Sequence, residues 1–294
     1  MNHSFETDAF TALGHPGRLA VFRLLARRAP QGVRPSDIAS ALSLKPNTLS
    51  AYVTTLCRAG LLTTWREGRS VYYGLDLSRM AGVLSFLVND CCRGRPELCE
   101  PISAPALAKL ARLHDRGAAP FEVLFVCTGN SARSQFAEAV LNRVGAGRFR
   151  AHSAGTKPAN AINPMAKAVL AEHGHPTGGL RPKALASYGI DDAGQMDFVF
   201  TLCDRAADED CPPLPGWPVT AHWGIAPPST RAQAERDEHK AFLATYEAVV
   251  ARIDHFVALP IHELSQRALQ QELDTIGALS QPSMPSRGTG AVHP

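Results

Sequence analysis

The sequence predicts two domains: a mostly helical N-terminal domain with a β-hairpin, and a C-terminal α/β domain with a four-stranded parallel sheet. A length of 294 residues suits about two domains of ordinary size. Near residue 121 the pattern changes from closely spaced helical segments to apolar strands that alternate with helices. Residues 1–100 contain 12 Lys and Arg against 8 Asp and Glu, whereas the remainder contains 18 against 19. This positive excess favours a nucleic-acid partner for the first domain.

The N-terminal elements follow a recognisable order. Residues 15–29 carry apolar side chains at helical spacing, and Pro16 suits a first helical turn. Residues 34–44 and 45–62 predict two further short helices. Two β-like runs at 61–65 and 70–77, joined by a turn at 66–69, predict a hairpin, and residues 78–92 predict another helix. Two short helices followed by a hairpin indicate a winged helix-turn-helix.

Three segments carry a resemblance to a known family over residues 5–92. They are FTALGHPGRLAVFRLL, NTLSAYVTTLCRAGLL and the hairpin REGRSVYYGL. Together they resemble the ArsR/SmtB family of metalloid-responsive repressors. The resemblance implies a homodimer, formed through helices near 5–13 and 78–91, that binds a near-palindromic ars-type operator.

The residues expected to contact DNA lie on the second of the two short helices and on the hairpin. The N-terminal part of that helix should enter the major groove, where amide and hydroxyl groups contact bases or phosphate. The hairpin arginines suit phosphate or minor-groove contact. The candidates are Asn47, Thr48, Ser50, Ala51, Tyr52, Thr55, Arg66 and Arg69.

A cluster of three cysteines follows the N-terminal domain's last predicted helix. The segment DCCRGRPELCE contains Cys91, Cys92 and Cys99. Three thiolates suit a soft, three-coordinate centre such as arsenite or antimonite. The arrangement resembles repressors of the same family that use a Cys-Cys pair and a third cysteine near the last helix. A zinc site and three structural thiols are the alternatives.

Domain boundaries follow from composition. Residues 1–100 form the predicted DNA-binding and sensing domain, and residues 101–120, rich in Ala and Pro, form a linker. Residues 121–262 form the α/β domain, with expected strands at 121–126, 149–155, 196–203 and 218–223 and helices between and after them. Residues 263–294 predict a helical extension and a disordered tail.

The sharpest chemical signal is the segment VLFVCTGNSARSQ, in which an apolar strand runs into Cys127 and a helix follows Arg133. A loop between a strand and a helix N-terminus presents backbone N–H groups to an anion. The Arg133 guanidinium matches two oxygens of a tetrahedral oxyanion. The same positive field favours a thiolate nucleophile at Cys127. The predicted anion-binding loop is Thr128, Gly129, Asn130, Ser131, Ala132 and Arg133.

This loop resembles the low-molecular-weight tyrosine phosphatases and the thioredoxin-coupled arsenate reductases built on their fold. The resemblance implies that Cys127 is the nucleophile, Arg133 the anion fork, Asn130 a loop-shaping amide and Ser134 a hydroxyl that supports the thiolate.

Downstream, FTLCDRAADEDCPPLPG contains two further cysteines at the places of a reductase's relay thiols, Cys203 and Cys211. The resemblance implies that arsenate is reduced through Cys127, Cys203 and Cys211 in turn, with thioredoxin as the reductant and no organic cofactor.

One departure from the family pattern bears on turnover. Members carry an Asp-Pro pair after the last strand, and its Asp is the general acid, whereas this chain has Ala226 and Pro227. General acid catalysis is typically worth about 10²–10⁴-fold, so turnover is expected to be slow. Asp204 and Asp237 are the substitutes that the sequence offers.

A second departure concerns a potassium site that some relatives form with residues matching Asn130, Glu138 and Ser153. Here Lys183 could place an ammonium group where those relatives hold the ion.

The whole sequence predicts an arsenic-responsive repressor fused to an arsenate reductase. The start of the chain lacks the pattern of a secretory signal, and no apolar run is long enough to span a membrane, so we expect a cytoplasmic protein. Three alternatives stay open: an α/β domain that binds oxyanion without turnover, a tyrosine phosphatase fused to a regulator, and a repressor with an inactive second domain.

Overall fold

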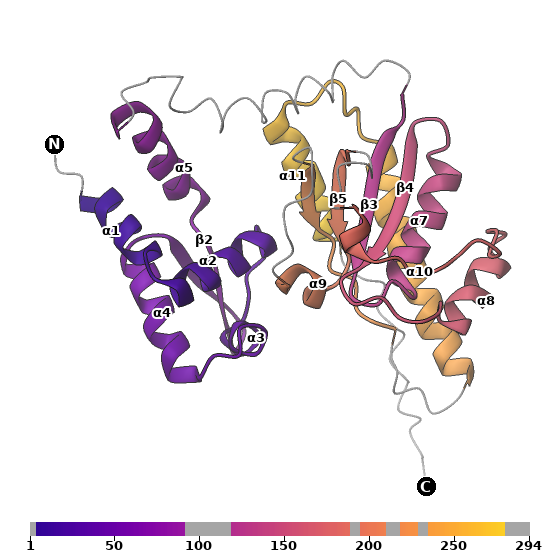
Figure 1. The fold of residues 1–294 in the computed structure, drawn as a ribbon, viewed down its shortest axis with the longest axis horizontal. Helices are drawn as coiled ribbons and strands as arrows, with labels where there is room; N and C mark the ends of the chain where they lie inside the picture. The colour runs from indigo at the N-terminus through magenta and orange to yellow at the C-terminus, as the bar shows by residue number, and fades with distance from the viewer. Residues whose placement is uncertain (1–3, 92–118, 189–194, 210–217, 229–234, 280–294) are drawn as a thin grey trace, which may run out of the picture.

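The computed structural model describes residues 4–91, 119–188, 195–209, 218–228 and 235–279. Figure 1 shows a helical N-terminal domain beside a C-terminal domain built on a sheet. The two domains have separate hydrophobic cores.

The N-terminal domain has its helices and hairpin in the predicted order. Its elements are α1 (Ser4–Leu13), α2 (Pro16–Arg28), α3 (Pro35–Ala41), α4 (Pro46–Arg58), β1 (Leu62–Glu67), β2 (Ser70–Leu75), α5 (Leu77–Phe86) and the short helical turn η1 (Leu87–Cys91). Proline opens α2, α3 and α4, where its missing N–H is not needed for a helical hydrogen bond. The core gathers one apolar face from each helix, including Leu24, Ile38, Leu49, Val53 and Leu56.

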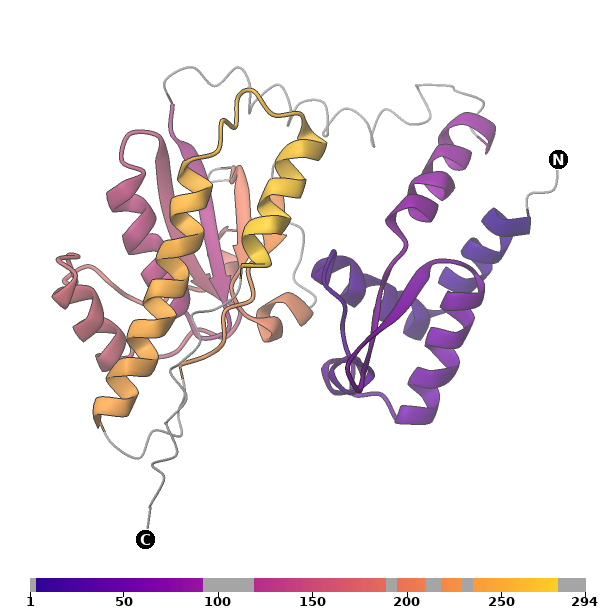
Figure 2. The same cartoon turned by 180° about the vertical axis from the view of Figure 1, so that it is seen from behind.

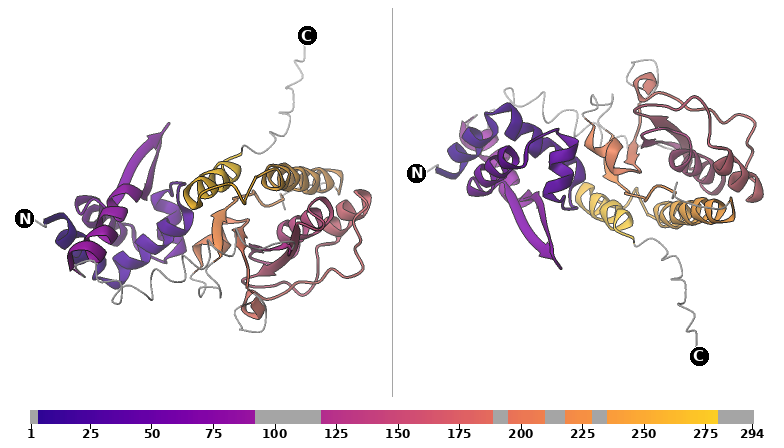
Figure 3. Two further views of the ribbon diagram at one scale, coloured as in Figure 1. Left: turned by 90° about the horizontal axis from the view of Figure 1, so that it is seen from above. Right: turned by 90° about the horizontal axis from the view of Figure 1, so that it is seen from below.

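The hairpin β1–β2 is antiparallel, with Glu67 opposite Ser70. Gly68 in its turn has φ 60°, a conformation that glycine adopts without steric cost. The two views in Figure 3 show the hairpin projecting from the helical domain.

The C-terminal domain alternates strands and helices. Its elements are β3 (Phe121–Cys127), α7 (Arg133–Val144), β4 (Phe149–Gly155), α8 (Pro164–Glu172), η2 (Leu185–Tyr188), β5 (Phe198–Thr201), α9 (Asp204–Asp208), β6 (Val219–His222), α10 (Glu235–Val257) and α11 (Gln266–Gly277).

The predicted four-stranded parallel sheet is confirmed, with strand order β4-β3-β5-β6. The central strand β3 is buried along nearly its whole length, as expected for a parallel sheet covered on both faces. Because parallel strands end at one edge, Cys127 in β3, Thr201 in β5 and His222 in β6 gather at the same edge of the sheet.

Two long helices close one face of this sheet, and Figure 2 shows α10 and α11 in front of the strands. Leu269, Leu273 and Ile276 of α11 are buried in the same core as the sheet. The indole N–H of Trp223, which follows β6, donates to the carbonyl of Leu273 over 3.2 Å. The residues assigned by sequence to a helical extension therefore share the core of the α/β domain.

The domains meet where α2 contacts α9 and β6. In the part of the chain that the structure describes, no helix is long and apolar enough to cross a membrane.

Candidate active site

The Cys127 thiol lies at the carboxyl end of β3, immediately before the loop that opens α7. Its side chain is buried, with only 3% of the residue exposed. The backbone N–H of Asn130 donates to the Cys127 sulfur over 3.2 Å, and the Ser134 hydroxyl oxygen lies 3.0 Å from the same sulfur. The loop thus directs an amide and a hydroxyl at the thiol, which suits a nucleophile used as a thiolate.

Asn130 shapes the loop through its backbone and its side chain. Its φ of 48° lies in the left-handed region, which asparagine tolerates better than most residues. Its side-chain amide donates to the Ser134 hydroxyl over 2.8 Å. Its side-chain carbonyl accepts from Gln135 over 3.1 Å and from the Lys183 backbone over 2.7 Å. These bonds fix the loop before any anion is bound.

The loop also rests against the end of β4. The backbone N–H groups of Thr156 and Lys157 donate to the carbonyls of Cys127 and Thr128 over 3.1 and 2.9 Å. At Gly155 a Cβ atom would lie 2.8 Å from the Thr128 carbonyl oxygen. Glycine therefore allows the two backbones to approach at this point.

A pocket of about 210 Å³ opens beside Cys127. Several predicted loop residues line it, namely Gly129, Ser131, Ala132 and Arg133. Asn130, in contrast, is fully buried and acts from behind the loop. The Arg133 guanidinium donates to the Ile225 carbonyl over 2.9 Å, which holds it against the segment that follows β6.

The second predicted thiol borders the same loop. The Cys203 sulfur lies 3.4 Å from the Thr128 hydroxyl oxygen, and Cys203 is 5% exposed. Cys203 and Thr128 line a neighbouring cavity of about 500 Å³, which shares Arg133 and Pro227 with the Cys127 pocket. Cys211 lies outside the described residues, so the structure places only the first of the two predicted relay cysteines.

Asp204 is one of the two carboxylates that the sequence offers as a proton donor. Asp204 lines the cavity beside Cys203 rather than the Cys127 pocket. A hydrogen bond with His222 and the charge of Arg28 hold the pKa of Asp204 well below its usual range, despite burial, which acts in the opposite direction. A carboxyl group kept ionised at neutral pH is a poor proton donor.

Glu238, near the start of α10, is the carboxylate among the described residues that line the Cys127 pocket. Asp237, the adjacent carboxylate that the sequence offers, is not among the residues that line this pocket. Helical periodicity does not show which of two adjacent acids faces the pocket, because that depends on how α10 packs against the loop.

The Lys183 side chain reaches Glu138. Its ammonium nitrogen lies 2.7 and 3.0 Å from the two carboxylate oxygens of Glu138. The Ser153 hydroxyl donates to the same carboxylate. The charge of Glu138 is thus balanced by an internal ammonium group.

The predicted DNA contacts on α4 fall into two kinds. Asn47, Ser50, Ala51 and Thr55 are exposed, and Thr48 is half-buried. Tyr52 instead packs inward, with its ring 5.1 Å from that of His15 and against Gly17, where a Cβ would lie 2.5 Å from the tyrosine ring.

The remaining N-terminal candidates lie on the hairpin and at η1. Arg66 and Arg69 are exposed at the end of the hairpin. Cys91 is exposed at the end of η1, whereas Cys92 and Cys99 lie outside the described residues. Within the described ranges, no group of three His, Cys, Asp or Glu side chains is placed to hold a metal ion.

Comparisons with known proteins agree with this geometry for the C-terminal domain. Residues 122–264 match the family model of low molecular weight phosphotyrosine protein phosphatase. An arsenate reductase of Shouchella clausii is 32% identical over 134 residues, which cover 46% of this chain and 93% of that protein. An arsenate reductase of Bacillus subtilis is 36% identical over 120 residues, which cover 41% and 82%.

Among solved structures, a thioredoxin-dependent arsenate reductase of Corynebacterium glutamicum is 28% identical. The match covers 55% of this chain and 72% of that one, with a TM-score of 0.36. On the evidence of the family model and of relatives that are matched over most of their length, the chain belongs to the low molecular weight phosphotyrosine protein phosphatase family through residues 122–264.

Proposed function

We propose that the C-terminal domain reduces arsenate to arsenite through a relay of three thiols. The observation that carries the proposal is the second buried thiol, Cys203, at the border of the Cys127 loop. Hydrolysis of a phosphate ester by Cys127 and Arg133 has no need of it. The similarity to arsenate reductases at 32–36% identity supports the same reading.

The reaction begins with attack of the Cys127 thiolate on arsenic. A sulfur–arsenic bond forms, and one arsenate oxygen leaves as water after protonation. The Arg133 guanidinium and the loop N–H groups bind the remaining oxygens.

The reduction itself occurs when the Cys203 thiolate attacks the Cys127 sulfur. A sulfur–sulfur bond forms, and the sulfur–arsenic bond breaks with its electron pair remaining on arsenic. Arsenic(V) becomes arsenic(III), arsenite leaves, and two thiols become one disulfide. The Cys211 thiolate then attacks Cys203, which regenerates the Cys127 thiolate and leaves a Cys203–Cys211 disulfide for a dithiol reductant of the thioredoxin type.

For the N-terminal domain we propose a winged helix-turn-helix that binds operator DNA as a dimer. The helix order, the projecting hairpin and the exposed Arg66 and Arg69 support this assignment. Phe10 of α1 and Leu84 of α5 are exposed apolar residues on the two helices expected at a dimer interface.

Arsenite bound by Cys91, Cys92 and Cys99 would release the DNA, so the C-terminal domain would produce the inducer of the N-terminal one. Labelled DNA bearing a near-palindromic ars-type operator should bind the protein and dissociate when arsenite is added. A Cys91/Cys92/Cys99→Ser triple variant that still releases the DNA with arsenite would refute this sensor.

A second function is favoured by Ala226 and Pro227. Without the usual Asp, the α/β domain would bind an oxyanion as a sensor without turnover. The domain would then act as a regulatory module. We propose a cytoplasmic location for the protein in either case.

One assay separates the two functions. Purified full-length protein is supplied with arsenate, thioredoxin, thioredoxin reductase and NADPH, with the Cys127→Ser variant as the control. NADPH oxidation that depends on arsenate and is lost in the variant supports the reductase. A folded protein that binds arsenate without oxidising NADPH supports the oxyanion sensor.

A further inference from the structure

Two consecutive arginines at the end of α2 make polar contacts with the C-terminal domain. The Arg27 guanidinium donates to the backbone carbonyls of Ala207 and Asp208, each over 2.9 Å. These carbonyls lie at the carboxyl end of α9, where a helix presents unpaired acceptors and partial negative charge. The N-terminal domain therefore supplies a cap to a helix of the C-terminal domain.

Arg28 reaches further and is 7% exposed. Its guanidinium donates to the Asp204 carboxylate and lies 3.0 Å from the His222 Nε2 atom. Its Nε lies 2.9 Å from an Asp208 carboxylate oxygen. One buried positive charge thus stands between two carboxylates of α9, and its removal would leave only Arg27 and His222 to offset them.

The same network extends to both sides of Cys203. The Thr201 hydroxyl, at the end of β5, lies 2.8 Å from His222 Nδ1, and His222 Nε2 lies 3.1 Å from the Asp204 carboxylate. Thr201 precedes Cys203 by two residues, and Asp204 follows it directly. Arg28 therefore contacts the chain on both sides of Cys203: Asp204 directly, and Thr201 through His222.

Helix α9 is too short to be stable by itself. It has five residues, Asp204–Asp208, whereas isolated helices below about 12–15 residues are marginal in water. Its first turn is bonded to the Cys203 carbonyl, which accepts from the N–H groups of Ala206 and Ala207 over 3.1 Å each. The position of the Cys203 backbone therefore depends on whether α9 is folded.

We propose that Arg28, a residue of the N-terminal domain, is a positioning residue for Cys203 in the C-terminal domain. Through Asp204, Asp208 and His222 it keeps α9 folded and the Cys203 thiol buried beside Thr128. All of α9 lies between Cys203 and Cys211, so docking of the N-terminal domain controls the segment that joins the two relay thiols. The importance of Cys203 to turnover rests on the proposed reductase function, whereas its position does not.

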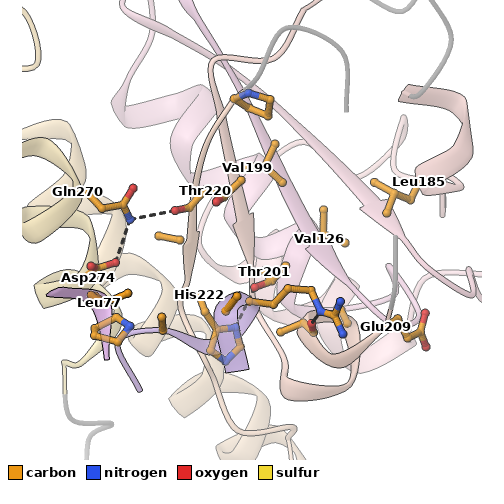
Figure 4. Close-up of a pocket in the computed structure, with 18 residues that line it drawn as sticks. Leu77, Val126, Leu185, Val199, Thr201, Glu209, Thr220, His222, Gln270 and Asp274 are labelled. Atoms are coloured by element: carbon orange, nitrogen blue, oxygen red, sulfur yellow. Dashed lines mark hydrogen bonds between the residues drawn. The ribbon is translucent and has the colours of Figure 1, made fainter. Parts of the chain in front are cut away.

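Open space lies on both sides of the contact that the two arginines make. A cavity of about 430 Å³ separates the domains on one side, and a groove of about 940 Å³ lies on the other. Figure 4 shows Leu77 of the N-terminal domain and Gln270 and Asp274 of α11 around the smaller cavity. A contact between domains opens more easily than a core does, so α9 can respond to events in the N-terminal domain.

Alkylation of individual thiols tests the proposal in the full-length protein. The reduced protein is treated with iodoacetamide, and modification of Cys203 and Cys127 is followed separately by peptide mass spectrometry. We expect Arg28→Ala to raise the Cys203 rate about tenfold or more, because α9 opens more often and exposes the thiol, with little change at Cys127. Arg28→Lys should give an intermediate rate, because it keeps the charge without the planar fork. The control, Arg58→Ala, removes an exposed arginine of α4 and should match the wild type.

Two results would overturn the proposal: an unchanged Cys203 rate in Arg28→Ala, or an equal rise at Cys203 and Cys127, which indicates general loosening. If Arg28→Ala does not fold, Asp208→Asn removes a partner from the other side of the contact and should also raise the Cys203 rate selectively. Because iodoacetamide requires neither arsenate nor a reductant, a failure of arsenate turnover would refute the proposed function and leave this measurement intact.

Discussion

The Cys203 sulfur lies 3.4 Å from the Thr128 hydroxyl oxygen, so a second thiol borders the loop that carries Cys127. The two thiols come together because β5 pairs with β3 and both strands end at the same edge of the sheet. An enzyme that only hydrolyses phosphate esters has no use for this pairing.

We therefore expect Cys203→Ser to separate reduction from hydrolysis. In a single turnover with arsenate, the variant should release no arsenite, because the Cys127–arsenic adduct has no second thiol to attack its sulfur. Any hydrolysis of an aryl phosphate by the wild type should persist in the variant. Arsenite can be measured by chromatography coupled to elemental mass spectrometry, and arsenite release equal to the wild type would exclude the relay.

Gly155 offers a test of the loop's packing. In Gly155→Ala the new Cβ would lie 2.8 Å from the Thr128 carbonyl oxygen, a backbone atom held by the Lys157 N–H. We expect a loss of about 1–3 kcal/mol in the free energy of unfolding, with reduced activity because the loop shifts.

Urea unfolding measures this loss, and Gly178→Ala is the matched control because nothing lies within 4 Å of a Cβ there. Equal unfolding midpoints for the two variants would mean that the close approach at Gly155 is unimportant.

Much of this site could be predicted from the sequence where the signal is local. Cys127, Arg133 and Ser134 belong to one strand–loop–helix segment, so their spacing alone brings them together. The pairing of Lys183 with Glu138 could be predicted only from the family resemblance, because 45 residues separate the two in the sequence.

Other features depend on packing that no local pattern carries. Arg28 and Asp204 are 176 residues apart and lie in different domains, and consecutive arginines at a helix end ordinarily predict a solvated surface. Tyr52 shares a helix with exposed candidates for DNA contact, yet its ring covers Gly17. In both cases the partner of the side chain follows from tertiary contacts and not from helical periodicity.

The Lys183–Glu138 pair predicts a response to monovalent cations. Removing the ammonium group in Lys183→Met leaves a carboxylate that is 20% exposed without its charged partner. We expect the free energy of unfolding to fall by about 1–3 kcal/mol. Potassium should restore part of this loss, whereas the wild type should unfold alike in potassium and sodium chloride. The double variant Lys183→Met/Glu138→Gln is the control, and a potassium response retained there would place the ion elsewhere.

The depressed pKa of Asp204 predicts a dependence of stability on pH. His222 and Arg28 favour the ionised carboxylate in the folded chain. A group with a lowered folded pKa stabilises the protein above its unfolded value, about 3.9, and loses that contribution as the pH falls through its folded value. Asp204→Asn should therefore reduce stability equally at pH 7 and pH 5, and the difference from wild type should shrink below about pH 4. Urea titrations at these pH values measure the difference in the free energy of unfolding between the variant and the wild type. A difference that already disappears between pH 7 and 5 would contradict a lowered pKa of Asp204.

The proposed attack on arsenate needs a proton for the departing oxygen, and Ala226 cannot supply one. Glu238 lines the Cys127 pocket together with Arg133 and Pro227, whereas Asp204 is kept ionised and faces the neighbouring cavity. We expect Glu238→Gln to lower the rate of adduct formation with arsenate by about 10²-fold or more if Glu238 is the general acid. The amide is nearly isosteric, so arsenate binding should be retained.

Rapid-mixing measurements of the first step over pH 5–9 test this assignment, with Asp237→Asn as the matched control on the adjacent position of α10. Loss of the rate and of its pH dependence in Glu238→Gln alone would identify the proton donor, because a residue that only shapes the pocket would lower the rate without changing the pH profile. Full activity in Glu238→Gln would mean that the step proceeds with a proton from water.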